Sequence, residues 1–410
     1  MNRRNFNKAF ISVLTGLSFC ETAKAASRMQ DHVVLDSRGP LEAADLQRAF
    51  HNAVSRGQKT LTVSNDVTLW ESLALPSGIE LIFLGTVYNR CRDVALLLEG
   101  VTRTRVRFTR LVGDGMNDRQ SGIAVRNSSD CEIEGVSISA TRNKGVEISC
   151  SGENTSQRNA VSIGYVSGSV GPDGAGISIF GRSCTRTIIK GGQYCGNRIG
   201  ITINGGQDNL IAKATCNDNH EAGVMIDGIV SRTGDGGRCN SLRSITCNGN
   251  GTHHDGYGGL YLGNGASSNV IVDLRAEENI GSGCRMSGGD GFANRSNVFA
   301  RLSLGKNRNG GFVASSSPET VILDSEASSN EGPGIHFFRS DRSRLSGRSI
   351  ANSADGLLIQ SADVDVTSFE AEDNGGFGIR IADGGSKSPG ASVKRYVSRS
   401  NRRGSQSWTD

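Results

Sequence analysis

Eleven glycines between Gly122 and Gly378 each begin a copy of one short apolar phrase, and this repeat constrains the fold more than any other feature of the chain. Successive glycines lie between 22 and 36 residues apart. Self-similarity at such a period indicates a solenoid of stacked repeats. The phrases are Gly122-Ile-Ala-Val, Gly145-Val-Glu-Ile, Gly176-Ile-Ser-Ile, Gly200-Ile-Thr-Ile, Gly223-Val-Met-Ile, Gly259-Leu-Tyr-Leu, Gly283-Cys-Arg-Met, Gly311-Phe-Val-Ala, Gly334-Ile-His-Phe, Gly356-Leu-Leu-Ile and Gly378-Ile-Arg-Ile.

The repeating unit has the pattern of a half-buried strand, because the second and fourth residues of each phrase are mostly aliphatic while the third varies. An asparagine precedes most of the glycines, and asparagines stacked at one turn can hydrogen-bond to their equivalents above and below. The sequence therefore predicts an all-β protein, a parallel β-helix over residues 61–390 with about 11 or more coils. The asparagines are Asn143, Asn197, Asn219, Asn279, Asn309, Asn330, Asn352 and Asn374.

Residues 1–25 have the pattern of an export signal. A basic start containing Arg3 and Arg4 is followed by an apolar run and a small-residue site that ends at Ala25. The paired arginines resemble a twin-arginine signal, which predicts a periplasmic or extracellular bacterial protein. Removal of this segment lowers the net charge from +4 to +1, which argues against a nucleic-acid-binding protein. No later apolar run approaches the roughly 20 residues of a membrane span.

The two ends of the predicted solenoid differ from its repeats. Residues 26–60 are predicted to form an N-terminal cap that includes an amphipathic helix over 40–56. Residues 391–410 are polar and basic, which predicts a tail or a last cap. The apolar face of the helix is predicted to contain Leu46, Ala49, Phe50, Ala53 and Val54.

Nine cysteines follow the signal, and an odd number cannot pair completely within one chain. Cys216 and Cys247 hold equivalent places in neighbouring coils, with Cys195 nearly so, which predicts small side chains stacked in the interior. The pairing of any disulfide and the oligomeric state stay open. The absence of a CxxC pair argues against a zinc site, and no metal or cofactor is predicted.

The opening of the repeat region resembles the pectate-lyase-like superfamily of secreted β-helix proteins. The resemblance lies in the helix followed by "TLTVSNDVTLWESLALPSGIELIFLG", and it extends as architecture over nearly the whole chain after the signal. It implies a right-handed parallel β-helix and polysaccharide lyase, hydrolase or epimerase activity. The sharper motifs of polygalacturonases, alginate epimerases and pectate lyases are missing, so the resemblance assigns no catalytic residue by position.

Insertions predict where the chemistry lies, because a coil that only stacks needs no extra residues at its turns. The longest interval, from Gly223 to Gly259, is expanded both after its first strand and before the next. Turns after Glu147 and Arg285 are also enlarged. These expansions predict a groove across the glycine phrases, long enough for several sugar units.

Outward residues of successive strands stack about 4.8 Å apart, so residues distant in sequence become neighbours in the groove. An arginine that neutralises a uronate carboxylate, together with a tyrosine or histidine that exchanges protons, suits proton abstraction next to a carboxylate. The predicted catalytic residues are Tyr261, Arg285, His254, Asp227 and Asp255. The predicted substrate-binding residues are His253, His336, Glu147, Asn204 and Arg380.

The sequence thus predicts an exported enzyme that cleaves an acidic, uronate-containing polysaccharide by β-elimination. Alternatives are C5 epimerisation of uronates, which shares the first proton abstraction, and a non-catalytic adhesin or carbohydrate-binding protein. A glycoside hydrolase would use two carboxylates, with Asp227 and Asp255 as candidates and Asp235 and Asp290 on neighbouring loops. The same acids could hold Ca²⁺, although no spaced oxygen-ligand motif supports such a site.

Overall fold

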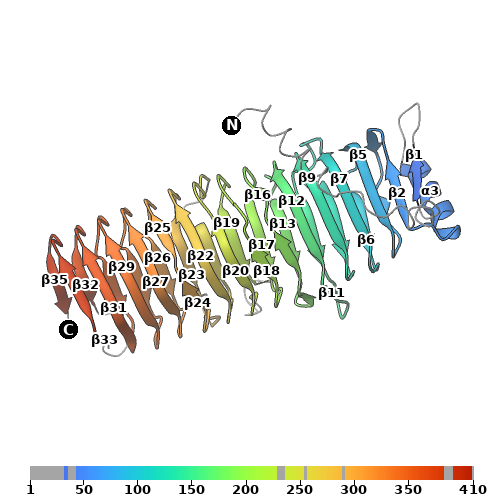
Figure 1. Ribbon diagram of the computed structural model, residues 1–410. Helices are drawn as coiled ribbons and strands as arrows, with labels where there is room; N and C mark the ends of the chain where they lie inside the picture. The colour runs from blue at the N-terminus through green and yellow to red at the C-terminus, as the bar shows by residue number, and fades with distance from the viewer. Residues whose placement is uncertain are drawn as a thin grey trace, which may run out of the picture.

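The computed structural model describes residues 32–35, 43–228, 236–253, 256–288, 291–382 and 391–408. Within these ranges the chain forms an elongated solenoid of β-strands with a single helix, α3 (Ala43–Ser55), at its N-terminal end (Figure 1). The predicted export signal, residues 1–25, lies outside the described residues. In the described part, no helix is long and apolar enough to cross a membrane.

One long sheet contains all eleven glycine phrases, and we call it the glycine sheet. Among the described residues it has 14 parallel strands, and their order along the sheet follows the order of the chain. The strands are β4 (Leu73–Ala74), β6 (Val94–Glu99), β8 (Ser121–Arg126), β10 (Lys144–Ser149), β13 (Ala175–Phe180), β17 (Ile199–Asn204), β19 (Ala222–Asp227), β21 (Gly258–Gly263), β23 (Ser282–Ser287), β26 (Phe312–Ser315), β28 (Ile335–Phe338), β30 (Leu357–Gln360), β32 (Phe377–Ile381) and β35 (Gly404–Trp408).

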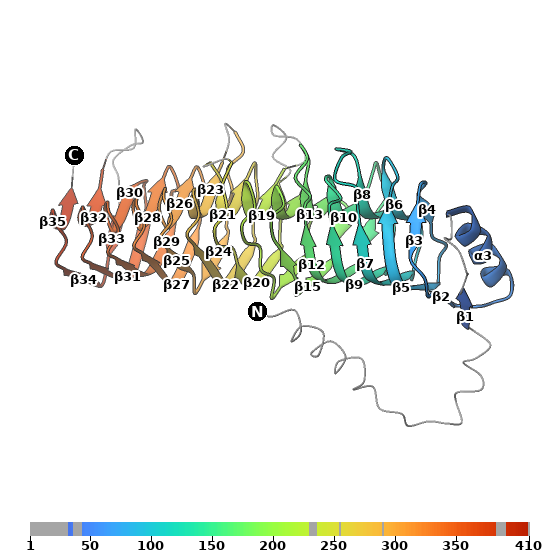
Figure 2. The same ribbon diagram turned by 90° about the horizontal axis from the view of Figure 1, so that it is seen from above.

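The remaining wall of each coil belongs to a second sheet, which runs beside the glycine sheet along the solenoid (Figure 2). A two-stranded sheet joins β11 (Ser156–Gln157) to β14 (Cys184–Thr185). In the described chain the second sheet consists of β1 (His32–Leu35), β2 (Thr60–Val63), β3 (Val67–Leu69), β5 (Glu80–Asn89), β7 (Arg105–Val112), β9 (Glu132–Ser139), β12 (Ala160–Ser167), β15 (Ile188–Lys190), β16 (Gln193–Tyr194), β18 (Leu210–Ala212), β20 (Ser241–Thr246), β22 (Val270–Glu277), β24 (Val298–Ala300), β25 (Ser303–Gly305), β27 (Val321–Ser328), β29 (Arg344–Ile350), β31 (Val364–Glu372), β33 (Ala391–Val393) and β34 (Tyr396–Arg399).

The predicted parallel β-helix is confirmed down to its register. Second residues of the phrases pair with one another on successive strands, and so do third residues; Tyr261, for example, lies beside Met225 on one side and Arg285 on the other. Residues 391–408 form a further coil, because β33 and β34 pair with β31 and β35 pairs with β32. The strand ladder therefore extends past residue 390 to Trp408.

Space, rather than backbone conformation, explains the repeated glycine. A Cβ atom on Gly200 would lie 2.4 Å from the carbonyl oxygen of Gly223 on the next rung. A Cβ atom on Gly259 would lie equally close to that of Gly283, at 2.4 Å. These separations are well inside van der Waals contact, so a larger residue would force the rungs apart. The glycine repeat is thus a packing requirement at one corner of the coil.

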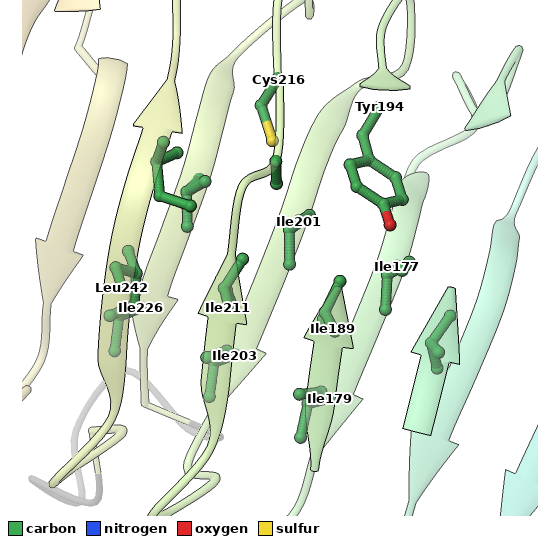
Figure 3. Close-up of a cluster of buried hydrophobic side chains, with 14 of the residues drawn as sticks. Ile177, Ile179, Ile189, Tyr194, Ile201, Ile203, Ile211, Cys216, Ile226 and Leu242 are labelled. Carbon is green, nitrogen blue, oxygen red and sulfur yellow. The ribbon is translucent and has the colours of Figure 1, made fainter. Parts of the chain in front are cut away.

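The core lies between the two sheets and is built from the same positions in every coil. Ile177, Ile201 and Ile203 of the glycine sheet face Ile189 and Ile211 of the second sheet (Figure 3), and all five are fully buried. Burial of such side chains stabilises the fold by roughly 1.5–3 kcal/mol each.

The predicted interior cysteines are only partly correct. Cys216 and Cys247 are fully buried, but Cys195 is partly exposed. Tyr194 takes the interior place beside Cys216 (Figure 3), with its hydroxyl donating to the carbonyl of Gly191 at 3.0 Å. The spacing predicts Cys195 at this place, one residue away from the residue that occupies it. A tyrosine can lie in a core when its hydroxyl has a hydrogen-bond partner.

An asparagine ladder follows one corner of the solenoid, as the sequence predicts. Asn279 donates to the side-chain oxygen of Asn307 at 2.8 Å, and it accepts from the backbone and side chain of Asn250. Two of the predicted members do not belong to the ladder. Asn309 is exposed and its place is taken by Asn307, while Asn143 stands outside the ladder. The members are Asn197, Asn219, Asn250, Asn279, Asn307, Asn330, Asn352, Asn374 and Asn401.

The helix α3 packs on the first rung of the solenoid and contacts β4. Leu46 and Phe50 are buried and belong to the same core cluster as the strand residues. Ala53 is buried as predicted, but Val54 is 44% exposed, so its assignment to the buried face is wrong. Successive residues of an α-helix are rotated by about 100° around its axis. Val54 therefore points away from the core when Ala53 faces it.

Candidate functional site

Tyr261 and Arg285 lie side by side on the outward face of the glycine sheet. They occupy directly paired positions of β21 and β23, and adjacent rungs are about 4.8 Å apart. Asp227, at the end of β19, lies one rung before β21 and two residues further along the strand. The register thus brings together three of the five predicted catalytic residues.

The phenol of Tyr261 and the carboxylate of Asp227 meet above Gly263. A Cβ atom on that glycine would lie 2.8 Å from both Tyr261 Oη and Asp227 Oδ1, so the missing side chain creates the space they share. Asp227 Oδ1 also accepts hydrogen bonds from the side-chain amide of Asn264 at 2.7 Å and from the backbone of Gly228 at 2.8 Å. These donors hold the carboxylate beside the phenol.

The phenol of Tyr261 keeps its proton at neutral pH. Burial raises the pKa of Tyr261 to about 12, with further contributions from the Asp227 charge and from Tyr257, while the Arg285 charge opposes the shift. Tyr257 packs edge-on against its ring with the centroids 4.7 Å apart. Burial also raises the pKa of Tyr257, aided by the Glu221 and Asp227 charges.

Arg285 differs from the other arginines near this face because no carboxylate of the described chain pairs with it. Its Nε atom is buried and has no hydrogen-bond partner among the described residues. In contrast, Arg126 contacts Glu147 at 3.3 Å and Arg198 contacts Glu221 at 2.8 Å. A partly buried guanidinium without a paired carboxylate suits a ligand that brings an anionic group.

A hollow of about 500 Å³ adjoins this cluster and covers the rungs from β10 to β19. Tyr257 connects the two, since it lines the hollow and packs on Tyr261. The hydroxyl of Ser178 on its floor is buried and has no hydrogen-bond partner within the described ranges, which leaves a donor and acceptor for a polar ligand. Other lining residues include Lys144, Glu147, Phe180, Arg198, Thr202, Asn204, Glu221 and Met225.

Two predicted binding residues line the hollow but are held by their own neighbours. Glu147 accepts from Arg126 Nε at 3.3 Å and from the hydroxyl of Ser149 at 2.8 Å. Asn204 lies on the rung next to Asp227 and accepts from the hydroxyl of Thr202 at 3.0 Å. Four rungs, about 19 Å, separate Glu147 from Tyr261.

His336 and Arg380 lie further along the sheet, away from the Tyr261 cluster. Two rungs, about 10 Å, separate His336 from Arg285, and its ring contacts Gln360 Oε1 at 2.9 Å. Burial lowers the pKa of His336, so the ring is neutral at pH 7. Arg380 lies four rungs from Arg285 and contacts Asp355 at 3.7 Å.

His253 is exposed at the turn before β21 and stacks on His220, with ring centroids 4.0 Å apart. Burial and the nearby His253 lower the pKa of His220. The predicted residues His254 and Asp255 lie outside the described residues, as do Asp235 and Asp290. Within the described ranges, no group of three or more histidine, cysteine, aspartate or glutamate side chains could hold a metal ion.

Known proteins with this architecture are similar in structure at low sequence identity. A mutant tailspike protein of E. coli bacteriophage HK620, in complex with a pentasaccharide, is 10% identical, with a TM-score of 0.56 over 92% of this chain and 80% of the tailspike. The A-module of the Azotobacter vinelandii mannuronan C-5 epimerase AlgE6 is 11% identical, with a TM-score of 0.51 over 90% of this chain and 95% of the module. The Dettilon tailspike protein is 12% identical, with a TM-score of 0.51 over 97% of this chain and 74% of that protein.

Residues 267–404 match the family model of the right handed beta helix region. The chain is a right-handed parallel β-helix. This confirms, at the level of the fold, the resemblance found in the sequence. A search of the curated proteins gave no match.

The β-helix positions several site residues that sequence reasoning missed. Tyr257 lies before the phrase of β21, where the alternation gives no signal, and Asn264 lies just after it. Ser178 was visible as a third-position residue, but its lack of a partner depends on the packing around it. A second hollow, of about 720 Å³, lies on the other sheet between Arg301 and Val397 and was not predicted.

Proposed function

We propose that this protein is an exported carbohydrate-active enzyme that cleaves a uronate-containing polysaccharide by β-elimination. The observation that carries the proposal is the juxtaposition of Arg285, without a described carboxylate partner, with the protonated Tyr261 and with Asp227. Two proteins with the same fold act on or bind glycans by name, the mannuronan epimerase and the tailspike with its pentasaccharide. They support a glycan as the ligand, while the choice of reaction depends on the site.

In the proposed reaction, Arg285 binds the uronate carboxylate and neutralises it, which stabilises the carbanion formed at the neighbouring carbon. A base removes the proton from that carbon, and the electron pair forms a double bond as the glycosidic oxygen leaves. Tyr261 donates its proton to the leaving oxygen, in keeping with its raised pKa. Among the described residues Asp227 is the nearest group suited to accept a proton, and His254 is the other predicted base.

We assign the hollow to sugar units next to the reacting one. It lies on the same sheet face, and Tyr257 forms its boundary with the catalytic cluster. Its polar lining and the partnerless hydroxyl of Ser178 suit hydroxyl-rich ligands. Such remote contacts position the substrate for the chemical step.

Hydrolysis by paired carboxylates is not supported by Glu221 or Glu147, while Asp255, the partner of Asp227 predicted from the sequence, lies outside the described residues. Glu221 lies at the opposite end of β19 from Asp227, about 20 Å along the strand. Glu147 lies three rungs from β19. Both separations exceed the roughly 6.5–9.5 Å of an inverting pair.

Epimerisation is the second candidate because it begins with the same proton abstraction. Tyr261 lies beside Asp227, so a proton donor and a proton acceptor are both available next to Arg285. If a proton is added to the opposite face of the carbanion before the glycosidic bond breaks, the sugar is inverted at C5 and the chain stays intact.

The decisive experiment incubates the protein with pectate, alginate and bacterial exopolysaccharides and follows the ultraviolet absorbance of unsaturated uronate ends. Absorbance supports elimination, whereas new reducing ends without absorbance indicate hydrolysis. An unbroken chain with changed C5 configuration indicates epimerisation, and binding without any product on every polymer indicates an adhesin.

Two variants test the assignment of residues once a product is found. We expect Arg285→Ala and Tyr261→Phe each to lower kcat/KM by about 100-fold or more. Arg348→Ala is the control, since it removes an arginine of the second sheet that already contacts Glu326. Full activity in Arg285→Ala and Tyr261→Phe would refute the proposed centre.

A further inference from the structure

Cys150 and Cys184 lie on successive coils next to the hollow, and we propose that they close to a disulfide bond that ties these coils together. Cys150 follows β10, and Cys184 begins β14 after the turn that leaves β13. Their sulfur atoms are 3.2 Å apart. A disulfide needs about 2.05 Å, so a small side-chain rotation suffices.

The backbone around the pair is fixed and leaves room for the bond. Cys150 donates its N–H to the carbonyl of Phe180 at 3.2 Å, and Cys184 donates to that of Gly181 at 3.1 Å. A Cβ atom on Gly181 would lie only 2.5 Å from the Cys150 sulfur, so only glycine leaves space for this thiol. The bond would therefore hold the turn that carries Phe180, which lines the hollow.

The two thiols differ in a way that sets the order of reaction. Cys150 is partly exposed, whereas Cys184 is fully buried. A hydrogen bond from the Cys184 thiol lowers the pKa of Cys150 to about 7, despite partial burial. The pKa of Cys184 is raised by the same contact and by its burial. Cys150 is thus the attacking thiolate and Cys184 the resolving thiol.

The reaction is an exchange with an external disulfide, such as oxidised glutathione. The Cys150 thiolate attacks one sulfur of the oxidant, forms a mixed disulfide and expels one glutathione thiolate. Cys184 then loses its proton, and its thiolate attacks Sγ of Cys150. The bound glutathione leaves as the second glutathione thiolate. Two protein thiols are oxidised to one disulfide, and one oxidant disulfide is reduced to two thiols.

The interior pair Cys216 and Cys247 is a poorer candidate. The two thiols interact with each other, but both residues are fully buried, so an oxidant has no first thiol to meet. Cys239 is exposed and could form mixed disulfides by itself, whereas burial raises the pKa of the partly exposed Cys195 thiol and so disfavours its reaction. Replacement of Cys239 by serine gives the background in which Cys150 is tested.

The test treats three proteins with oxidised glutathione and measures intact mass. Cys239→Ser should lose the mass of two hydrogens and retain no glutathione. Addition of Cys184→Ser should trap one glutathione on Cys150, because no thiol resolves the mixed disulfide. Addition of Cys150→Ser should trap none. Retained glutathione in Cys239→Ser, or equal labelling of the two double variants, would overturn the proposal.

A second measurement uses the unsubstituted chain and so does not depend on the folding of any variant. After oxidation, a digest without reductant should yield a peptide pair that joins Cys150 to Cys184, and reduction should separate it. Oxidation should also raise the thermal midpoint, since the bond closes a loop of one coil. A cross-link between other cysteines, or two alkylatable thiols at these positions after oxidation, would contradict the bond.

Discussion

Tyr261 shows how one side chain acquires a role from its neighbours on other coils. Its sequence context is an ordinary outward strand position, yet the folded chain places Asp227, Tyr257 and Arg285 around its hydroxyl. Burial and the negative charge of Asp227 favour the protonated phenol, while the charge of Arg285 and a hydrogen bond with Ser287 oppose them. The stacking of successive coils therefore determines that the phenol of Tyr261 stays protonated.

We expect Tyr261 to stay protonated across the whole pH range of ordinary assays. Because its pKa is about 12, a catalytic rate that depends on the phenol should not decline on the alkaline side until the pH approaches that value. A kcat/KM profile measured up to pH 10 tests this, with the exposed Tyr165→Phe as the control for nonspecific effects of losing a hydroxyl. An alkaline decline near pH 8 that disappears in Tyr261→Phe would show that the pKa is not raised.

His336 should make the stability of the fold depend on pH. Its pKa in the folded state is lowered by burial, against the hydrogen bond to Gln360 and the charge of Asp355, while the unfolded state keeps a value near 6.5. The contribution of the neutral His336 to the stability of the folded state is therefore complete above about pH 6.5. It is lost as the pH falls below that value, because the unfolded state binds the proton more readily. Thermal midpoints at pH 7.5 and pH 5 should differ more in the wild type than in His336→Gln.

The control for this comparison is His51→Gln, which removes a histidine from the exposed side of α3. We expect His51→Gln to keep the full wild-type pH dependence. An equal dependence in His336→Gln would mean that other groups cause it.

The asparagine ladder is the element that links successive coils at their corner. We expect Asn279→Ala to lower the free energy of unfolding by about 2–4 kcal/mol, because it leaves buried donors of Asn250 and the carbonyl of Cys247 without the side chain that they bond and removes one of the two donors to Asn307. Asn309→Ala is the matched control, an exposed asparagine outside the ladder, with an expected change within about 0.5 kcal/mol. Urea denaturation measures both, and similar losses in the two variants would contradict the ladder's role.

The fold could be predicted from the sequence because every coil repeats the same packing demand. The glycine at the corner, the alternation after it and the nearby asparagine all arise from contacts between equivalent positions on adjacent rungs, so they recur in the chain. Errors arose where one coil departs from that rule. Tyr194 replaces a small interior residue, and Asn307 replaces Asn309 where the corner lies two residues earlier.

The site could be predicted only as far as it follows the register. Tyr261 and Arg285 are neighbours because third positions stack, which the sequence indicates directly. The contacts of Tyr257 and Asn264 depend on how the chain enters and leaves β21, and no periodicity extends there. Whether an arginine is paired also depends on its surroundings, as Arg285 and Arg380 show.

The solenoid as a whole has an apolar interior that runs from end to end, so its stability requires that the ends be covered. At the N-terminal end α3 lies across the first rung (Figure 2), and Leu46 and Phe50 are buried against the same core as the strands. At the other end the last described coil, β33 to β35, pairs with β31 and β32. A cap that packs on only one rung is held by few contacts, and its loss would expose strand edges.

We therefore expect Leu46→Asp to uncover the end of the solenoid. A buried carboxylate without a partner destabilises the packing of α3 by about 3 kcal/mol or more, so the helix should separate from β4 and expose the first rung. The measurement is binding of a hydrophobic dye together with light scattering, both of which should increase. Val54→Asp is the matched control, the same change on the exposed side of the same helix, where neither signal should change. If Leu46→Asp scattered no more light and bound no more dye than Val54→Asp, the helix would not be needed to cover the core, and the first strands would form a stable end of the solenoid.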